Sequence, residues 1–188
     1  VKNKYVTNFM TDNNGVSTCL QFGVWAKDVL GIGMRKYWGN LYVTRFDDYG
    51  KELSGEVYPI SRHVFTDEVS EQAIDNNADN SYLGAASYFY KKNCYIFFND
   101  YRDNFDKAVN EDIRDVISCY ATDAMYYTIS KKDGVRKNYL LGEPTGQEHK
   151  QVCTETEYFD EKTGLLTGIA RIVRDGKAEF HVFWKKLD

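Results

Sequence analysis

The amino-acid sequence predicts a mainly β protein: an antiparallel β-barrel or strongly curved sheet built of hairpins, with one packed α-helix. Three observations favour this class. Two tight-turn signatures lie between alternating apolar runs, short segments are rich in aromatic and β-branched residues, and one stretch alone carries a long helical stripe. Closing the sheet would remove exposed strand edges, which favours a barrel. An α+β roll is the alternative.

Strand patterns cover much of the first hundred residues. Residues 16–25 alternate between two faces, although a helix is an alternative there. Tyr, Phe and Val content predicts the other strands. The expected strands are Val16–Trp25, Leu41–Phe46, Gly55–Phe65, Tyr82–Tyr90 and Cys94–Phe98. Thr66 is a suitable N-cap for a short helix through Ile74, and residues 99–104 are polar and turn-like.

One stretch has the apolar spacing of an amphipathic helix. Its apolar side chains are Phe105, Val109, Ile113, Val116, Ile117 and Tyr120. We expect a helix over Asp106–Tyr120 that packs its apolar stripe onto the sheet.

The last third of the chain contains the clearest hairpins. Arg174-Asp175-Gly176-Lys177 lies between two alternating runs, and Lys131-Lys132-Asp133-Gly134 does the same between Met125–Ser130 and Val135–Leu141. A two-residue turn at 175–176 places Arg171 opposite Phe180. Residues 46–55 and 159–168 resemble each other and are both expected to be strand–turn–strand units.

That register divides the C-terminal hairpin into two faces. The more apolar face, expected to point inward, holds Thr167, Ile169, Arg171, Val173, Ala178, Phe180, Val182 and Trp184. The other holds Leu166, Arg174, Glu179, His181, Phe183 and Lys185. A guanidinium among apolar side chains needs an anionic partner. Arg171 would therefore anchor a ligand carboxylate or form an ion pair with Glu155 or Glu157, unless it lies at an edge where its head reaches water.

Aromatic residues from several predicted strands could line an apolar pocket beside Arg171, although such residues also commonly fill a core. The predicted ligand-binding residues are Arg171, Trp25, Trp38, Tyr88, Tyr90, Phe97, Tyr127 and Phe180. The predicted partner is a small apolar or amphiphilic molecule, with a protein as the alternative.

The cysteines favour a secreted, extracellular protein. Four cysteines are widely spaced, and the chain starts at Val1, as a mature secreted protein can. We expect disulfides Cys119–Cys153 and, by elimination, Cys19–Cys94; four buried thiols in a cytosolic protein are the alternative. The first pairing assumes that Cys153 points outward, towards the helix that carries Cys119.

The composition and the motifs of the chain make several classes of function less expected. The length of 188 residues suits a single domain, 1-188, and a net charge of -4 disfavours a nucleic-acid partner. No apolar run reaches the ~18 residues of a membrane span. No nucleophile elbow, phosphate loop or metal-ligand spacing occurs, so an enzyme is less expected, and neither a cofactor nor a metal is predicted. Glu179 and His181 are expected to be a solvated pair.

Two short motifs resemble a known family. Gly23-Val24-Trp25 is similar to the G-x-W of the first lipocalin strand, and Asn99-Asp100-Tyr101 resembles the T-D-Y of a later loop. The resemblance implies an eight-stranded barrel that holds an apolar ligand, with Trp25 closing its base. Gln21 departs from the aromatic residue usual at its position.

Three functions follow from these observations. The first is a secreted, lipid-binding type of protein that holds a small apolar or amphiphilic ligand in a β-barrel cavity. The second is a secreted protein-binding effector or inhibitor without a ligand cavity. The third is an enzyme on a cone-shaped α+β sheet.

Overall fold

The computed structural model describes residues 3–12, 15–27, 34–47, 49–60, 62–66, 82, 84–107, 111–116, 119–130 and 133–188. Before residue 40, in 62–66 and at 119 it describes the backbone. Strands make up 59% of the structure and helices 5%, which confirms the mainly β class. Contacts divide the chain into two compact units, residues 1–80 with 106–117 and residues 81–105 with 118–188. The single domain over 1-188 stays a prediction.

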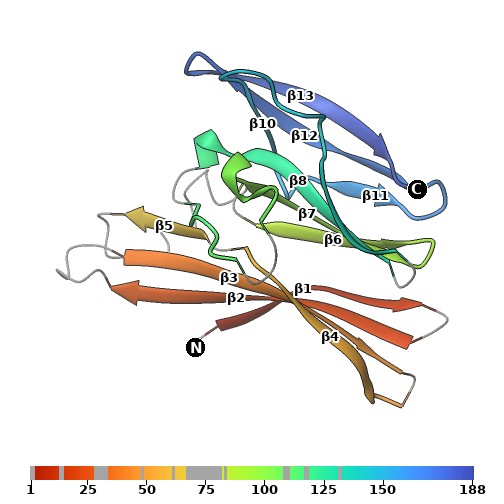
Figure 1. Cartoon of the computed structure of the whole chain (residues 1–188). Coiled ribbons are helices and arrows are strands. Elements are labelled where there is room, and N and C mark those ends of the chain that lie inside the picture. Colours follow the sequence, from red (N-terminus) through yellow and green to blue (C-terminus); the bar gives the residue numbers. More distant parts are fainter. Residues whose placement is uncertain are drawn as a thin grey trace. The chain divides into compact units, whose positions relative to one another are not determined.

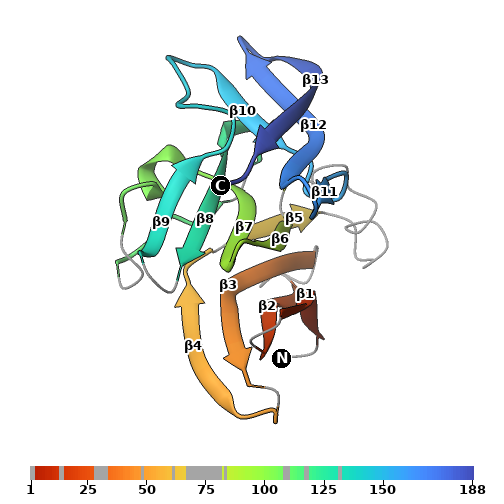
Figure 2. The same ribbon diagram turned by 90° about the vertical axis from the view of Figure 1, so that its right-hand side faces the viewer.

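The first unit contains one five-stranded antiparallel sheet. Its strands are β1 (Asn3–Asp12), β2 (Gly15–Lys27), β3 (Met34–Phe46), β4 (Glu52–Tyr58) and β5 (Arg62–Thr66). The long β3 pairs with β5 along its first half and with β4 along its second half. Irregularities in register interrupt β1, β2 and β3, and such bulges bend strands. Figure 2 shows the resulting curvature of β3 and β4.

The second unit is a sandwich of two antiparallel sheets (Figure 1). One sheet has the order β6 (Ala85–Tyr90), β7 (Asn93–Asp100), β8 (Asp123–Ser130), β9 (Gly134–Tyr139). In the other, β12 (Leu165–Arg174) pairs on one side with β10 (His149–Val152) and β11 (Tyr158–Asp160), and on the other side with β13 (Lys177–Lys186). Two 3-10 turns, η2 (Arg102–Asn104) and η3 (Cys119–Ala121), lie between β7 and β8.

Side chains from both sheets fill the core of the second unit. The buried cluster is Tyr95, Phe97, Ala124, Leu140, Val152, Leu166, Ala170, Phe183 and Leu187. Gly168 lies opposite Phe183 across the β12–β13 pair, and a Cβ at this position would come within 2.8 Å of the Phe183 ring. The absence of a side chain at Gly168 therefore leaves room for the ring of Phe183.

The predicted hairpins are confirmed. Arg174 pairs with Lys177 and Arg171 with Phe180, and the turn residues Asp175 and Gly176 have φ of 49° and 73°, as a type I′ turn requires. Strands β8 and β9 form the second predicted hairpin, with Ser130 opposite Gly134.

The two similar segments, residues 46–55 and 159–168, are both strand–turn–strand units. In the β3–β4 turn the carboxylate of Asp47 accepts the backbone N–H groups of Tyr49 and Lys51. In the β11–β12 turn Asp160 accepts the N–H of Lys162 in the same way.

Most predicted strands are confirmed. The strand expected over Val16–Trp25 is confirmed over the helix alternative, since β2 covers it. The single strand over Gly55–Phe65 is wrong, because β4 ends at Tyr58 and β5 begins at Arg62. Pro59, which lacks a backbone N–H, follows β4 directly. The short helix from Thr66 through Ile74 lies outside the described residues beyond Thr66, which ends β5.

The predicted helix over Asp106–Tyr120 is wrong. Its described residues are a turn, an irregular segment, an isolated bridge at Val116 and the 3-10 turn η3. Asn and Asp at positions 104, 106, 110, 112 and 115 compete with helical backbone bonds through their own side chains. At the start of the segment, Phe105 stacks on Tyr139 of β9, with ring centroids 4.2 Å apart. This apolar residue of the predicted stripe therefore packs on β9 without a helix.

The structure also differs from the barrel that the sequence favours. Among the strands described, each of the three sheets has two edges and none closes on itself. The sheet of the first unit is curved, as the strongly curved sheet in the prediction requires.

Candidate functional site

The outer face of the β12–β13 hairpin exposes large apolar side chains. Their exposed fractions are 67% for Tyr158, 39% for Ile169, 65% for Phe180, 71% for Val182 and 72% for Trp184. We call these five residues the aromatic face. The register places Val182 opposite Ile169, and Trp184 opposite Thr167, which is itself the partner of Tyr158. Because directly opposed residues share a face, the five side chains lie on one side of the sheet.

The inward face of this hairpin is the reverse of the one expected from sequence. Leu166 and Phe183, assigned to the more polar face, are buried in the core, whereas Phe180 and Trp184, assigned inward, are exposed. Successive side chains of a strand point to opposite faces. Choosing the wrong face as the inward one therefore reverses the predicted direction of every side chain in the hairpin. The sequence correctly predicts which residues share a face, but the face expected to point inward points outward.

Strand β13 forms an edge of its sheet. Within the described part of the chain it pairs with β12 and with no other strand, and Figure 1 shows it at the rim of the sheet. The N–H of Leu187 donates to the carbonyl of Gly164, on the β12 side. Because backbone groups alternate in direction along an antiparallel strand, odd-numbered residues of β13 bond towards β12 and even-numbered ones point away.

Arg171 is buried although it lies on the outward face. It is 6% exposed, its Nε donates to Oε1 of Gln151 at 2.6 Å, and its guanidinium lies 3.8 Å from the centre of the Tyr82 ring. The Tyr120 ring is 4.7 Å away on η3. The burial predicted from sequence is confirmed, and tyrosine rings with an amide surround the guanidinium. The ion pair with Glu157 is not formed, because both carboxyl oxygens of Glu157 lack a hydrogen-bond partner.

Among the other predicted ligand-binding residues, those whose side chains the structure describes do not meet around one cavity. Tyr88, Tyr90 and Phe97 pack in the core cluster, where Tyr88 lies against Phe159 at 5.1 Å between ring centroids. Tyr127 lies on the opposite face of β8, beside Phe98. Phe180 belongs to the aromatic face. The side chains of Trp25 and Trp38, on β2 and β3, lie outside the description.

The predicted disulfides are not formed. Cys94 and Cys153 are buried thiols rather than disulfide sulfurs, so the pairings Cys119–Cys153 and Cys19–Cys94 are both wrong. Each of these pairings contains one of the two thiols.

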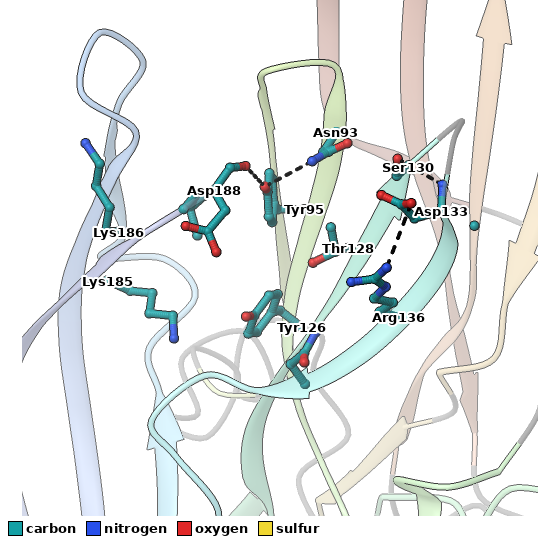
Figure 3. A pocket seen from close by; sticks show the side chains of 13 residues that line it. Asn93, Tyr95, Tyr126, Thr128, Ser130, Asp133, Arg136, Lys185, Lys186 and Asp188 are labelled. Atoms are coloured by element: carbon teal, nitrogen blue, oxygen red, sulfur yellow. Dashed lines mark hydrogen bonds and ion pairs between the residues drawn. The ribbon is translucent and has the colours of Figure 1, made fainter.

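A polar cleft of about 340 Å³ lies between the end of β13 and the β7–β9 strands (Figure 3). The rings of Tyr95 and Tyr126 form one wall, and Lys185 and Arg136 reach towards it from two sides. Burial, and less so the neighbouring Tyr95, raises the pKa of Tyr126, so its hydroxyl stays protonated at neutral pH. Hydroxyl, amide and cationic groups suit a small polar molecule rather than an apolar one. No predicted ligand-binding residue lines this cleft.

Two buried carboxylates lie side by side where β7 ends and β8 begins, Asp100 and Asp123. Asp123 accepts Nε of Arg102 at 2.7 Å and lies 3.1 Å from Nδ1 of His149. Asp100 lies opposite Asp123 in the register, 3.7 Å from Nζ of Lys137. These donors compensate the buried charges, so the cluster holds β7, β8 and β10 together.

Glu157 is a buried acid of a different kind. Both carboxyl oxygens are shielded from solvent and have no hydrogen-bond partner in the described structure. Its Cγ lies close to Gly168, next to the Phe183 ring. Burial raises the pKa of this carboxyl to about 8, and burial, with a smaller contribution from Glu157, raises the pKa of Tyr88 as well. Glu157 therefore carries a proton at neutral pH.

The described residues also show an exposed Glu–His pair, but no cluster of metal ligands and no membrane-spanning helix. Glu179 and His181 form an exposed pair at 3.4 Å, as the sequence predicts. In the described residues no three His, Cys, Asp or Glu side chains gather as a metal site would require, and no helix is long and apolar enough to span a membrane.

Neither the cleft nor the burial of Asp100, Asp123 and Glu157 was predicted from the sequence. The cleft residues come from four strands, and no local pattern links them. The aromatic face, by contrast, has a sequence signal in the alternation of Phe180, Val182 and Trp184.

No family model, curated protein or solved structure matches this chain.

Proposed function

We propose that this chain is a protein-binding module that docks a partner on the aromatic face. The observation that carries the proposal is the exposure of Phe180, Val182 and Trp184, each about two-thirds or more open to solvent on one strand. Contiguous exposed apolar side chains mark interaction surfaces, and tryptophan and tyrosine are the residues that most often dominate binding energy.

The position of these side chains also supports recognition. They project from a strand that pairs with β12 along its whole length, and Phe183, between Val182 and Trp184, is buried in the core on the other face, so the backbone beneath them is held in place. A rigid array loses little conformational entropy when a partner binds. Since Tyr88, Tyr90 and Phe97 fill the core of the second unit, we choose the protein-binding alternative over an apolar cavity there.

Site-specific photo-crosslinking tests the proposal. We would place p-benzoylphenylalanine at position 182 and, as the matched control, at position 49, where Tyr49 is 96% exposed in the turn of the other unit. In extracts or secretions of the source organism, we expect one dominant protein adduct from position 182 and none of that mass from position 49.

Two further results are needed for support. The adduct must disappear in Trp184→Ser, and the purified partner must bind this variant at least about tenfold more weakly than wild type, as loss of an anchoring aromatic predicts. Equal adducts from both positions, or an adduct unaffected by Trp184→Ser, would overturn the proposal.

A further inference from the structure

We infer that the protein docked at this surface is a second copy of the chain, joined by antiparallel pairing of β13 with β13 across a twofold axis at Val182. The inference rests on the proposed function and deepens it by naming the partner. Its evidence is the edge of β13 that no described strand covers, the direction of its backbone groups and the order of charges along it.

The edge is long and suited to strand addition. β13 spans Lys177–Lys186, and in the described structure no strand covers its outer side. Such an edge offers a row of N–H and C=O groups to another strand. The even-numbered residues, among them Phe180, Val182 and Trp184, direct these groups outward, because odd-numbered Leu187 bonds towards β12.

This direction restricts the possible registers. A second β13 must pair even-numbered residues with even-numbered residues, so a twofold axis passes through one residue. An axis at Val182 places Phe180 opposite Trp184 of the second copy, and Trp184 opposite its Phe180. The aromatic face then continues across the junction as cross-strand aromatic pairs, which stabilise antiparallel strands.

Charge favours Val182 over the neighbouring centre, His181. With the axis there, Glu179 lies opposite Lys185 of the second copy, and the twofold repeats this pair. An axis at His181 would instead place Lys177 opposite Lys185, and like charges in this position destabilise a sheet. Glu179 is 74% exposed, so it is accessible from the open side of the strand. Glu179, the one acidic residue of β13, therefore meets a lysine from the second half of the strand when β13 is antiparallel to itself.

Sedimentation velocity on the full chain tests the inference. At about 100 μM, well above the dissociation constant of a micromolar dimer, wild type should sediment as a dimer. Val182→Pro removes an outward N–H without removing a bond to β12, so it should sediment as a monomer. Val182→Thr, which keeps this N–H, is the matched control and should remain a dimer.

Charge reversal tests the register independently of the proline. Glu179→Lys should weaken dimerisation by about tenfold or more, because it turns two attractive pairs into repulsive ones. Adding Lys185→Glu to this variant should restore the dimer. Within one strand the two positions are six residues apart, roughly 20 Å, so only pairing between copies explains a rescue.

Each contrary outcome has a distinct meaning. A monomeric wild type, a dimer that survives Val182→Pro, or a double reversal that stays weak would each refute the inference. A monomeric chain that still crosslinks at position 182 to a different protein would refute the second copy and leave the proposed function standing. A monomer without any such adduct would refute both.

Discussion

Single residues in this protein illustrate two ways to bury an ionisable group. The guanidinium of Arg171 lies against the Tyr82 ring and donates to Gln151. Glu157 has no such donor and is held in its neutral form by burial. A charge that loses water without gaining a partner is costly, and an acid can avoid the cost by keeping its proton. Glu157 therefore links folding to pH.

Glu157→Gln should make the second unit more stable at alkaline pH. With its pKa raised to about 8, the folded chain keeps a proton that the unfolded chain releases above its ordinary pKa near 4.5. The free energy of unfolding therefore falls as pH rises between these values, by up to about 1.4 kcal/mol per pH unit. Gln removes this dependence.

Urea denaturation at pH 5 and pH 8 measures this effect. The difference between Glu157→Gln and wild type should grow with pH. Glu161→Gln, at an exposed position in the neighbouring turn, is the control and should track wild type. Parallel pH profiles for wild type and Glu157→Gln would contradict the burial of this acid.

Among the elements, the β12–β13 hairpin is the most completely determined by local sequence. Asp175 and Gly176 adopt positive φ, which Asp and Gly tolerate better than most residues, and the two-residue turn then sets every pair along the strands. The predicted helix over Asp106–Tyr120 had only apolar spacing in its favour. A helix also needs residues that do not compete for its backbone bonds, and this segment has several Asp and Asn.

Gly176→Val should destabilise the hairpin strongly, and Gly176→Asn only slightly. At φ of 73° a β-branched side chain clashes with its own backbone, at a cost of at least about 1–2 kcal/mol, whereas Asn adopts this conformation readily. No heavy atom lies within 4 Å of the position of a Cβ here, so the loss would come from the backbone and not from packing. Chemical denaturation of both variants checks the order; equal losses would argue against a positive φ.

In the whole molecule, packing between sheets decides which face of a strand is core. Leu166 is fully buried, whereas Ile169, three residues along the same strand, is 39% exposed. The alternation in sequence is compatible with either face pointing inward. Val152, Phe97 and Tyr95 of the other strands complete a core around Leu166 and Phe183, and this fixes the direction.

Leu166→Ala and Ile169→Ala together test which face of β12 points into the core. Removing a fully buried leucine side chain should lower the free energy of unfolding by about 2–5 kcal/mol, and removing the half-exposed isoleucine by less than about 1.5 kcal/mol. Thermal or urea unfolding measures both. A larger loss for Ile169→Ala would mean that the aromatic face is the core.

Sequence by itself determined the mainly β class, both hairpins, the register of β12 with β13 and the grouping of residues on each face. These are local properties, because turn conformation and period-two alternation involve neighbours in the chain. Tertiary structure alone decided that Phe180 and Trp184 face outward, that Asp106–Tyr120 is not a helix, and that residues from four strands form the polar cleft. Each depends on which distant segment packs against which, and a pattern along one strand carries no information about the surface that will cover it.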